Sequence, residues 1–294
     1  MALRRYLQTE VALDHADGLL SRRDALRKLG LLGLSAAAAS GLLAACSSEA
    51  TPPAPAAPPT TTPVDAGYDI AAATARTSAI TFPGGMQGGY AAPTGTPAGA
   101  VLVVHENKGL TDHIRAVAGR LAGDGYAALA PDLLSRVGGT AAAPDATAAL
   151  GGISAADLVA DLRSGLAELA RRHPGLPIGA MGFCFGGGMV WQLLDSGPSE
   201  LRAAVPFYGP VPDKPTFTGV RAAVLGIFAA KDARVNSGRD RAEAALTAAG
   251  LTHELYTAPG VDHAFFNDTG ARFNRAAAAD VYGRTLAWFR THLV

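Results

Sequence analysis

Three residues with complementary chemistry stand far apart along the chain: Cys184, Asp232 and His263. Cys184 lies in the segment Gly-Phe-Cys-Phe-Gly-Gly (182–187), after one apolar run and before another. Strand, glycine-flanked nucleophile and helix form a nucleophile elbow, here with Cys where Ser is commoner. Glycine neighbours let the strand and the helix approach each other closely. Because the predicted helix begins just after the thiol, its free N–H groups favour a thiolate or an oxyanion there.

Asp232 and His263 each follow an apolar run that predicts a strand, at 222–228 and 253–256. Open α/β sheets place their sites at these carboxyl ends. His263 can take the proton of the thiol, and Asp232 can fix the tautomer of the histidine. Taken singly, the three residues read as a buried Cys, a packed His and a loop carboxylate. Together, in the order nucleophile, acid, histidine, they favour a triad, and the rival Asp262 is badly placed as the immediate neighbour of His263.

The rest of the catalytic region alternates between helix and strand patterns, which indicates an α/β fold with a mostly parallel sheet and helices on both faces. Residues 137–152 are expected to form a loop or lid, and Pro131 is expected to end the strand that precedes it. Two short segments, 80–82 and 89–92, are expected to pair as edge strands. The other predicted strands are 100–104, 126–130, 177–181 and 203–208, and the predicted helices are 111–123, 154–172, 188–194, 239–249 and 274–292.

Further motifs stand near the triad: His-Glu-Asn at 105–107, Ala-Pro-Asp-Leu at 130–133, and Ala-Phe directly after His263. With these motifs, residues 68–294 resemble the dienelactone hydrolase (carboxymethylenebutenolidase) family of the α/β-hydrolase superfamily. The resemblance implies hydrolysis of an ester or lactone without a cofactor, with Cys184 as nucleophile, His263 as base and Asp232 as its orienter. It also implies that Glu106 contacts the resting thiol and helps to activate it. A buried carboxylate in a hydrogen-bond network is the alternative for Glu106.

The same resemblance implies an oxyanion hole made by the backbone N–H groups of Phe185 and Asn107. It implies that Arg136 binds the carboxylate of the substrate. A second family arginine, four residues past the catalytic histidine, is replaced here by Asn267. Because Asn cannot form the charged, bidentate clamp of Arg, dienelactone itself is less expected than other esters or lactones. His105 is expected to be structural.

Residues 1–46 have the parts of an export signal: a charged region, an uncharged run and small residues before Cys46. Paired Arg22 and Arg23 resemble a twin-arginine signal, and Leu-Ala-Ala-Cys resembles a bacterial lipoprotein box, which predicts lipidation of Cys46. An uncleaved membrane anchor or a buried Ala-rich helix are the alternatives. Residues 1–20 are expected to form a short polar helix.

The Pro-, Thr- and Ala-rich segment 47–66 is expected to be a linker, and residues 67–294 form the predicted catalytic domain. The predicted location is therefore outside the cytoplasm, as a membrane-anchored lipoprotein of the periplasm or cell surface.

The composition of the chain limits the kinds of partner and cofactor that it is expected to bind. The chain has 294 residues with 25 basic and 25 acidic side chains, so no basic excess supports nucleic-acid binding. It has two cysteines and lacks C-x-x-C, H-E-x-x-H and P-loop patterns, so no metal or nucleotide cofactor is expected. We expect a monomeric enzyme that acts on a small ester or lactone and touches membranes only through its lipid anchor or signal. Thioester or amide hydrolysis, and a non-catalytic surface binding module, are alternatives. The intact triad argues against the last.

Overall fold

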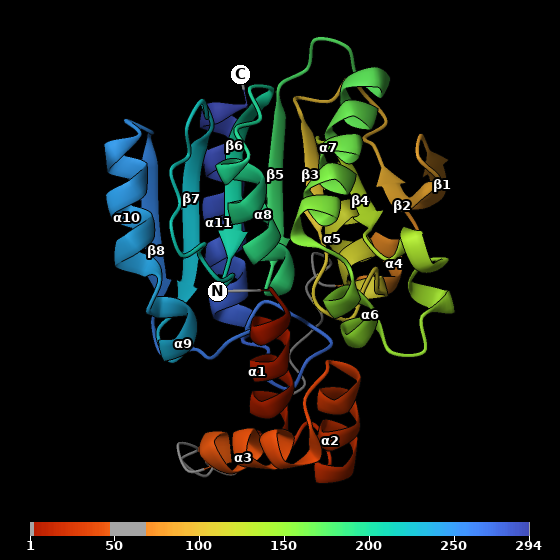
Figure 1. The fold of residues 1–294 in the computed structure, drawn as a ribbon. Helices are drawn as coiled ribbons and strands as arrows, with labels where there is room; N and C mark the ends of the chain where they lie inside the picture. Colours follow the sequence, from red (N-terminus) through yellow and green to blue (C-terminus); the bar gives the residue numbers. More distant parts are fainter. Residues whose placement is uncertain (1–2, 48–68, 294) are drawn as a thin grey trace.

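The computed structural model describes residues 3–47 and 69–293. Its centre is an eight-stranded sheet with the order β1-β2-β4-β3-β5-β6-β7-β8 (Figure 1). The first two strands pair antiparallel with each other and β2 pairs antiparallel with β4, whereas the other neighbours are parallel. This confirms the predicted α/β-hydrolase class. The strands are β1 Ser78–Phe82, β2 Met86–Ala91, β3 Ala100–Val104, β4 Ala127–Asp132, β5 Ile178–Phe183, β6 Leu201–Phe207, β7 Ala223–Ala229 and β8 His253–Ala258.

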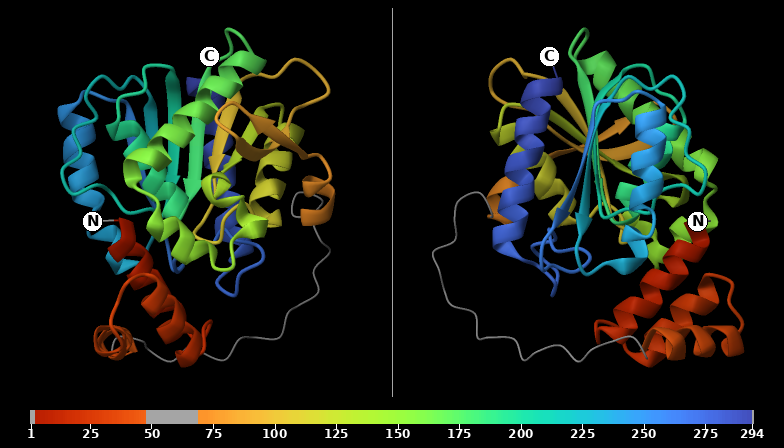
Figure 2. Two further views of the ribbon diagram at one scale, coloured as in Figure 1. Left: turned by 45° about the vertical axis from the view of Figure 1, so that its right-hand side comes forward. Right: turned by 90° about the vertical axis from the view of Figure 1, so that its left-hand side faces the viewer.

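Helices cover both faces of the sheet, and this explains why the central strands are apolar throughout. Helices α7 and α8 lie on one face, and α5 and α11 lie on the other (Figure 2). Every residue of β3, β5 and β7 is buried. The helix predicted at 154–172 is present as α7, and its Leu158, Leu162, Leu166 and Leu169 are buried at helical spacing. The helices of this part of the chain are α4 Ile70–Thr74, α5 Asp112–Gly123, α6 Ala146–Gly152, α7 Ala155–Arg172, α8 Phe185–Asp195, α9 Ala233–Asn236, α10 Arg239–Ala248 and α11 Arg275–His292.

Three sequence predictions for this region are wrong in detail. Strand β2 is not an edge strand, because it also pairs with β4. Strand β4 continues through Pro131, opposite Gly88 of β2. Its pairing with β3 ends at Leu129, so the missing N–H of the proline falls beyond the parallel ladder. The expected loop 137–152 contains helix α6, whose first turn is capped by the Asp145 carboxylate.

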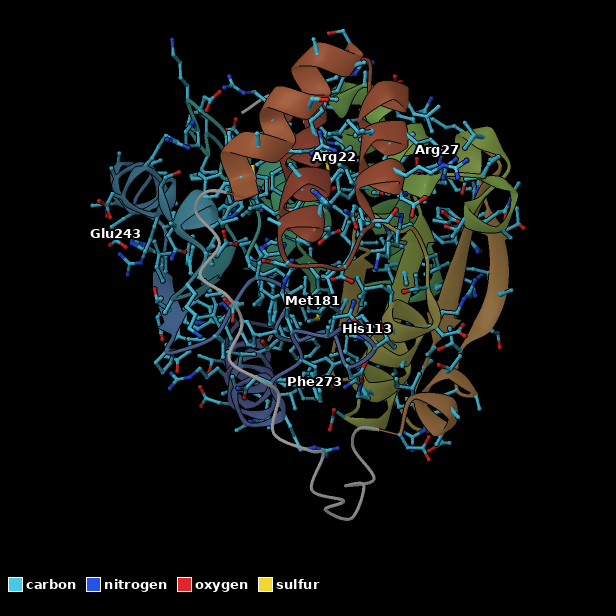
Figure 3. All side chains as sticks on the ribbon, turned by 90° about the horizontal axis from the view of Figure 1, so that it is seen from below. Arg22, Arg27, His113, Met181, Glu243 and Phe273 are labelled. Atoms are coloured by element: carbon cyan, nitrogen blue, oxygen red, sulfur yellow. The ribbon has the colours of Figure 1, made fainter. Side chains whose placement is uncertain are left out.

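The N-terminal residues form three helices, α1 Leu3–Ala16, α2 Arg22–Leu31 and α3 Ala36–Ser47. Seen from below, they cross the end of the molecule where the parallel strands finish (Figure 3). The prediction of a merely polar helix at 1–20 is wrong, because α1 buries Tyr6, Leu7, Glu10 and Val11. Within the described residues, no helix is long and apolar enough to cross a membrane. The predicted linker 47–66 lies almost wholly outside the described ranges.

Candidate active site

Cys184 occupies a strained turn between β5 and α8. Its φ is +55°, in the region that disfavours side chains other than hydrogen. The glycines around Cys184 are needed because a Cβ at their positions would overlap neighbouring backbone atoms. A Cβ on Gly182 would lie 2.5 Å from the carbonyl oxygen of Gly186, and a Cβ on Gly186 would lie 2.3 Å from that of Val104. The structure therefore confirms the predicted elbow, with Cys184 at its tip.

Asp232 and His263 meet at this tip. Asp232 follows β7 and caps helix α9, and His263 lies in the loop after β8. The Nδ1 atom of His263 lies 2.5 Å from Oδ2 of Asp232. Asp262 instead points its exposed carboxylate at Lys231, 3.6 Å from Nζ. Asp232, rather than Asp262, therefore orients the histidine, as the sequence predicted.

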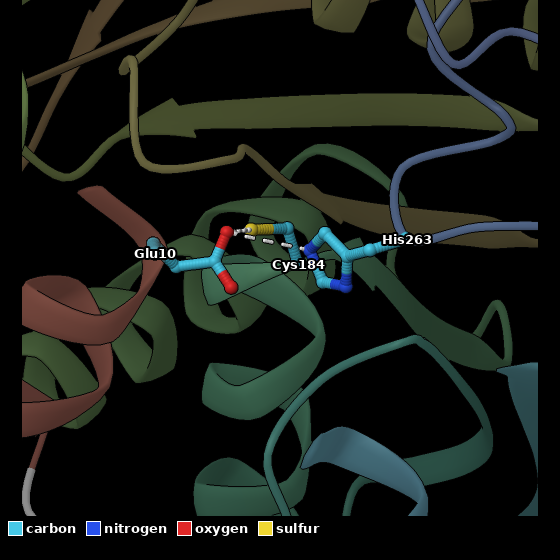
Figure 4. Close-up of side chains that lie close together, drawn as sticks. All are labelled: Glu10, Cys184 and His263. Carbon is cyan, nitrogen blue, oxygen red and sulfur yellow. Dashed lines mark hydrogen bonds and ion pairs between the residues drawn. The ribbon is translucent and has the colours of Figure 1, made fainter. Parts of the chain in front are cut away.

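Two residues of helix α1 reach the thiol, and sequence analysis missed both. The Cys184 thiol lies 3.6 Å from Oε2 of Glu10, and the Tyr6 hydroxyl lies 3.3 Å from the same sulfur. Figure 4 shows Glu10 pointing at both Cys184 and His263, and its Oε2 lies 3.6 Å from Nε2 of His263. The available signal was the helical spacing of Tyr6, Leu7, Glu10 and Val11, which places them on one face.

The buried carboxylate changes the protonation of the site. Burial raises the pKa of the Cys184 thiol and Glu10 raises it further, although His263 opposes them. Burial alone would lower the pKa of His263. The neighbouring Glu10, Cys184 and Asp232 reverse this effect and hold that pKa well above its usual value. The prediction that this environment favours the thiolate is therefore wrong while α1 occupies the site. In this arrangement both pKa shifts favour the protonated forms of the sulfur and the imidazole.

Glu106 is buried near the triad and is held by Asn267, whose side-chain amide donates to Oε2 of Glu106. Among the described residues, the hydrogen-bond partners of the Cys184 sulfur are Tyr6 and Glu10, so the implied contact between Glu106 and the thiol is not made. Its negative charge still contributes to raising the pKa of Cys184, less than burial and Glu10 do. Asn267 thus takes a role that the sequence did not suggest, as the partner of Glu106.

The residues predicted around the oxyanion lie at element ends. Phe185 is the first residue of α8, where backbone N–H groups have no partner within the helix. Asn107 follows β3. His105 Nδ1 lies 2.7 Å from the carbonyl oxygen of Glu106, and its Nε2 accepts the N–H of Leu133 at 3.1 Å. The bond from Leu133 joins the ends of β3 and β4, in line with the structural role predicted for His105.

Two further predicted site residues lie apart from the triad. Arg136 donates to both carboxylate oxygens of Asp161 in α7, at 2.8 and 2.9 Å. This ion pair is half-exposed, and a role in substrate binding stays a prediction. Cys46 lies near the end of α3 and is partly exposed. Its lipidation also stays a prediction.

The space in front of the thiol is filled. A cavity of about 260 Å³ lies beside β1 and β2, and none of its lining residues belongs to the triad.

The donor atoms of Glu10, Cys184 and His263 lie within 4.8 Å of one another, a set of atom types that can bind a transition metal. Hydrogen bonds and ion pairs among these atoms, with Arg234 and Asp232 as further partners, account for the cluster without an ion.

Comparisons with known proteins find similar sequences and a similar solved structure. "Putative carboxymethylenebutenolidase" of Escherichia coli K12 is 31% identical over 213 residues, covering 67% of this chain and 78% of the relative. Its counterpart of the same name in Synechocystis is 30% identical over 212 residues, covering 66% and 86%. A crystal structure titled as a putative dienelactone hydrolase from Klebsiella pneumoniae matches with a TM-score of 0.66 at 31% identity, covering 74% of this chain and 98% of the other.

The family match covers the part of the chain that carries the elbow, Asp232 and His263. The sequence model of the "Dienelactone hydrolase family" matches residues 86–293, which include all eight strands except β1. The N-terminal helices lie outside the match. From the strand order, the elbow and this match over most of its length, we conclude that the chain is a hydrolase that belongs to the dienelactone hydrolase family.

Proposed function

We propose that this hydrolase cleaves a carboxylic ester or lactone through a covalent acyl-enzyme formed on Cys184. The observation that carries the proposal is the alignment of Asp232, His263 and the thiol at the strained elbow. The 2.5 Å contact fixes Nδ1 of His263 against Asp232, which leaves Nε2 directed toward the side of the sulfur. A histidine oriented in this way can pass a proton between nucleophile and leaving group.

The reaction begins when the site is open and His263 is neutral. Nε2 of His263 accepts the thiol proton, and the sulfur attacks the carbonyl carbon of the substrate. The resulting oxyanion accepts hydrogen bonds from the backbone N–H groups of Phe185 and Asn107. Collapse breaks the bond to the alkoxide, which takes the proton from His263 and becomes the alcohol. A water molecule, deprotonated by His263, then attacks the thioester and releases the acid and the free thiol.

A substrate panel with paired cysteine variants tests this proposal. Activated esters, lactones, a thioester and an amide are offered to the wild type, to Cys184→Ala and to the control Cys46→Ala. We expect ester or lactone hydrolysis in the wild type and the control, its loss in Cys184→Ala, and an acyl adduct on Cys184 by mass spectrometry. Preferred cleavage of the thioester or the amide would show that the substrate class is a thioester or an amide and not an ester or lactone. Undiminished hydrolysis by Cys184→Ala would refute the mechanism.

We also propose that the protein is exported and lipidated on Cys46. The supporting features are the uncharged run before the Leu-Ala-Ala-Cys motif and the exposed Arg22 and Arg23 of α2, which a transport receptor can reach. Mass spectrometry of protein extracted from membranes tests this proposal. A lipid on Cys46 with residues 1–45 removed is expected. An unmodified Cys46 on an intact chain would contradict it.

A further inference from the structure

Helix α1 closes the active site from the N-terminal end of the chain. Glu10 and Tyr6 come from a segment more than 170 residues away from Cys184 in sequence, yet both lie within 3.6 Å of its sulfur. Both side chains are buried, and Cys184 itself is only 4% exposed. An attacking sulfur needs the carbonyl carbon of its substrate about 3–3.5 Å away. Glu10 and Tyr6 fill that space.

The acidic side of α1 matches cations on the catalytic domain. Glu10 forms an ion pair with Arg234, which follows Asp232 closely in the chain. Asp14 and Asp17 both pair with Arg272, which is mostly buried. The Arg234 guanidinium also lies over the ring of Tyr6, 4.5 Å from its centroid. The helix is therefore held by charge complementarity around the nucleophile.

Contacts outside the site fix the rest of the N-terminal segment. Nζ of Lys28 in α2 lies 2.8 Å from Oδ2 of Asp145, at the start of α6. Arg4 Nε donates to the carbonyl oxygen of Gly151 at 3.1 Å. The Leu32 side chain packs so closely over Gly151 that an added Cβ there would lie 2.4 Å from it. Residues from α1, from α2 and from the turn after α2 thus dock on one surface beside the elbow.

We propose that helix α1 is an intrachain inhibitor of the hydrolase site, with Glu10 and Tyr6 occupying the place of the acyl group of the substrate. The blocked thiol does not depend on the proposed function. The consequence does rest on it, and that consequence is slower turnover by the full-length chain than by the chain without α1. Separation at the predicted lipidation site, Cys46, would remove α1 and α2 whole and nearly all of α3. The full-length chain is then a latent form, and the chain that begins at Cys46 is the active one.

The blocked thiol is tested by alkylation of the full-length protein. Cys46→Ser provides the background, so that Cys184 is the only thiol. Leu7 is fully buried in α1, and Leu7→Glu places a charge in the docking surface. Leu31 is 56% exposed on α2, so Leu31→Glu is the matched control with the same substitution. Rates of Cys184 modification by iodoacetamide and rates of ester and lactone hydrolysis are measured for each protein.

We expect Leu7→Glu to raise the rate of alkylation and kcat/KM by about tenfold or more, because a site that is open about a tenth of the time reacts at about a tenth of its full rate. Leu31→Glu should leave both rates unchanged. Glu10→Arg, which puts a cation against Arg234, is a second way to release the helix if Leu7→Glu does not fold. Hydrogen exchange in α1 reports whether the helix has undocked.

The outcomes separate the two proposals. Equal alkylation of the background protein and of a variant whose α1 is undocked would overturn the inference, whatever the substrate result. Faster alkylation without hydrolysis of any ester or lactone would keep the inhibitory contact and refute the proposed function. Faster alkylation in Leu31→Glu as well would show a general loosening of the fold, and would also overturn the inference.

Discussion

Two buried His–Asp pairs in the described part of the chain have nearly the same geometry. His263 meets Asp232 at 2.5 Å, and His113 of α5 meets Asp268 at 2.6 Å, in each case through Nδ1. Among the described residues, neither Nε2 atom has a hydrogen-bond partner. The ion-pair distance from Glu10 to Nε2 of His263, 3.6 Å, is too long for a hydrogen bond. The pairs themselves do not reveal which of them is catalytic.

The two pairs differ in the groups that surround each histidine on the side away from its aspartate. The Nε2 side of His263 faces the Cys184 thiol, whereas the ring of His113 packs edge-on against Phe183 and Phe266. Asp268 is also neutralised by Arg120, with Nη2 to Oδ2 at 3.0 Å. His263 can therefore exchange a proton with the Cys184 thiol, whereas the ring of His113 faces aromatic side chains. The second pair instead ties α5 to the loop that carries His263, which is a structural task.

The largest difference is expected when each histidine is removed. His263→Ala should lower kcat by about 10³-fold or more, as removal of a triad base does. His113→Ala should change kcat by less than about threefold but lower the free energy of unfolding by about 1–3 kcal/mol, since it leaves buried polar groups unpaired. Steady-state kinetics and urea unfolding of both variants make the comparison. A kcat lost equally in both would show that the second pair also serves the chemistry.

Replacing the two aspartates should likewise affect catalysis in one pair and stability in the other. Asp232→Asn is expected to lower kcat by about 10²-fold or more, because the amide cannot stabilise the imidazolium. Asp268→Asn leaves the guanidinium of Arg120 buried beside a neutral group. Loss of a buried charge partner costs about 3–5 kcal/mol, or about 6 °C or more in Tm for a domain of this size. Thermal unfolding checks this effect, and an unchanged Tm in Asp268→Asn would contradict the structural role.

Asn267 lies in the chain next to Asp268 and holds Glu106, so it links the two regions. Asn267→Arg adds a cation that can bind an anionic substrate, but Glu106 competes for it. We therefore expect kcat/KM for carboxylate-bearing lactones to rise by about three- to tenfold relative to neutral esters. Asn267→Gln is the neutral control. Equal changes for charged and neutral substrates would remove the electrostatic explanation.

The smallest expected effect is a shift in pH dependence. Burial raises the pKa of Cys184 and the Glu10 charge raises it further. Glu10→Gln removes only the second contribution, so the rise of the alkylation rate with pH should move to lower pH. The pKa of His263 should fall as well, because Glu10 is one of the groups that raise it. Glu200→Gln, a change at an exposed residue, is the control. A shift to higher pH in Glu10→Gln would contradict this account.

The sequence alone determined the fold class, and it predicted the elbow and a triad of Cys184, Asp232 and His263. These features are local: a strand pattern, glycines in a turn, and polar residues directly after strands whose carboxyl ends must meet at one edge of a parallel sheet. The preference for Asp232 over Asp262 followed from adjacency, because Asp262 is the immediate neighbour of His263. In the structure Asp232 is the residue that lies 2.5 Å from Nδ1 of His263.

Only the tertiary structure decided what surrounds the triad. Glu10 and Cys184 are separated by 174 positions, and Asn267 and Glu106 by 161, so no periodicity or motif connects them. Arg136 could bind a substrate or a carboxylate of its own chain, and the packing of α7 beside it brought Asp161 within reach. The protonation of Cys184 was misjudged for the same reason. A pKa depends on every charge within a few ångströms, and the nearest charge came from a helix that the sequence assigned to an export signal.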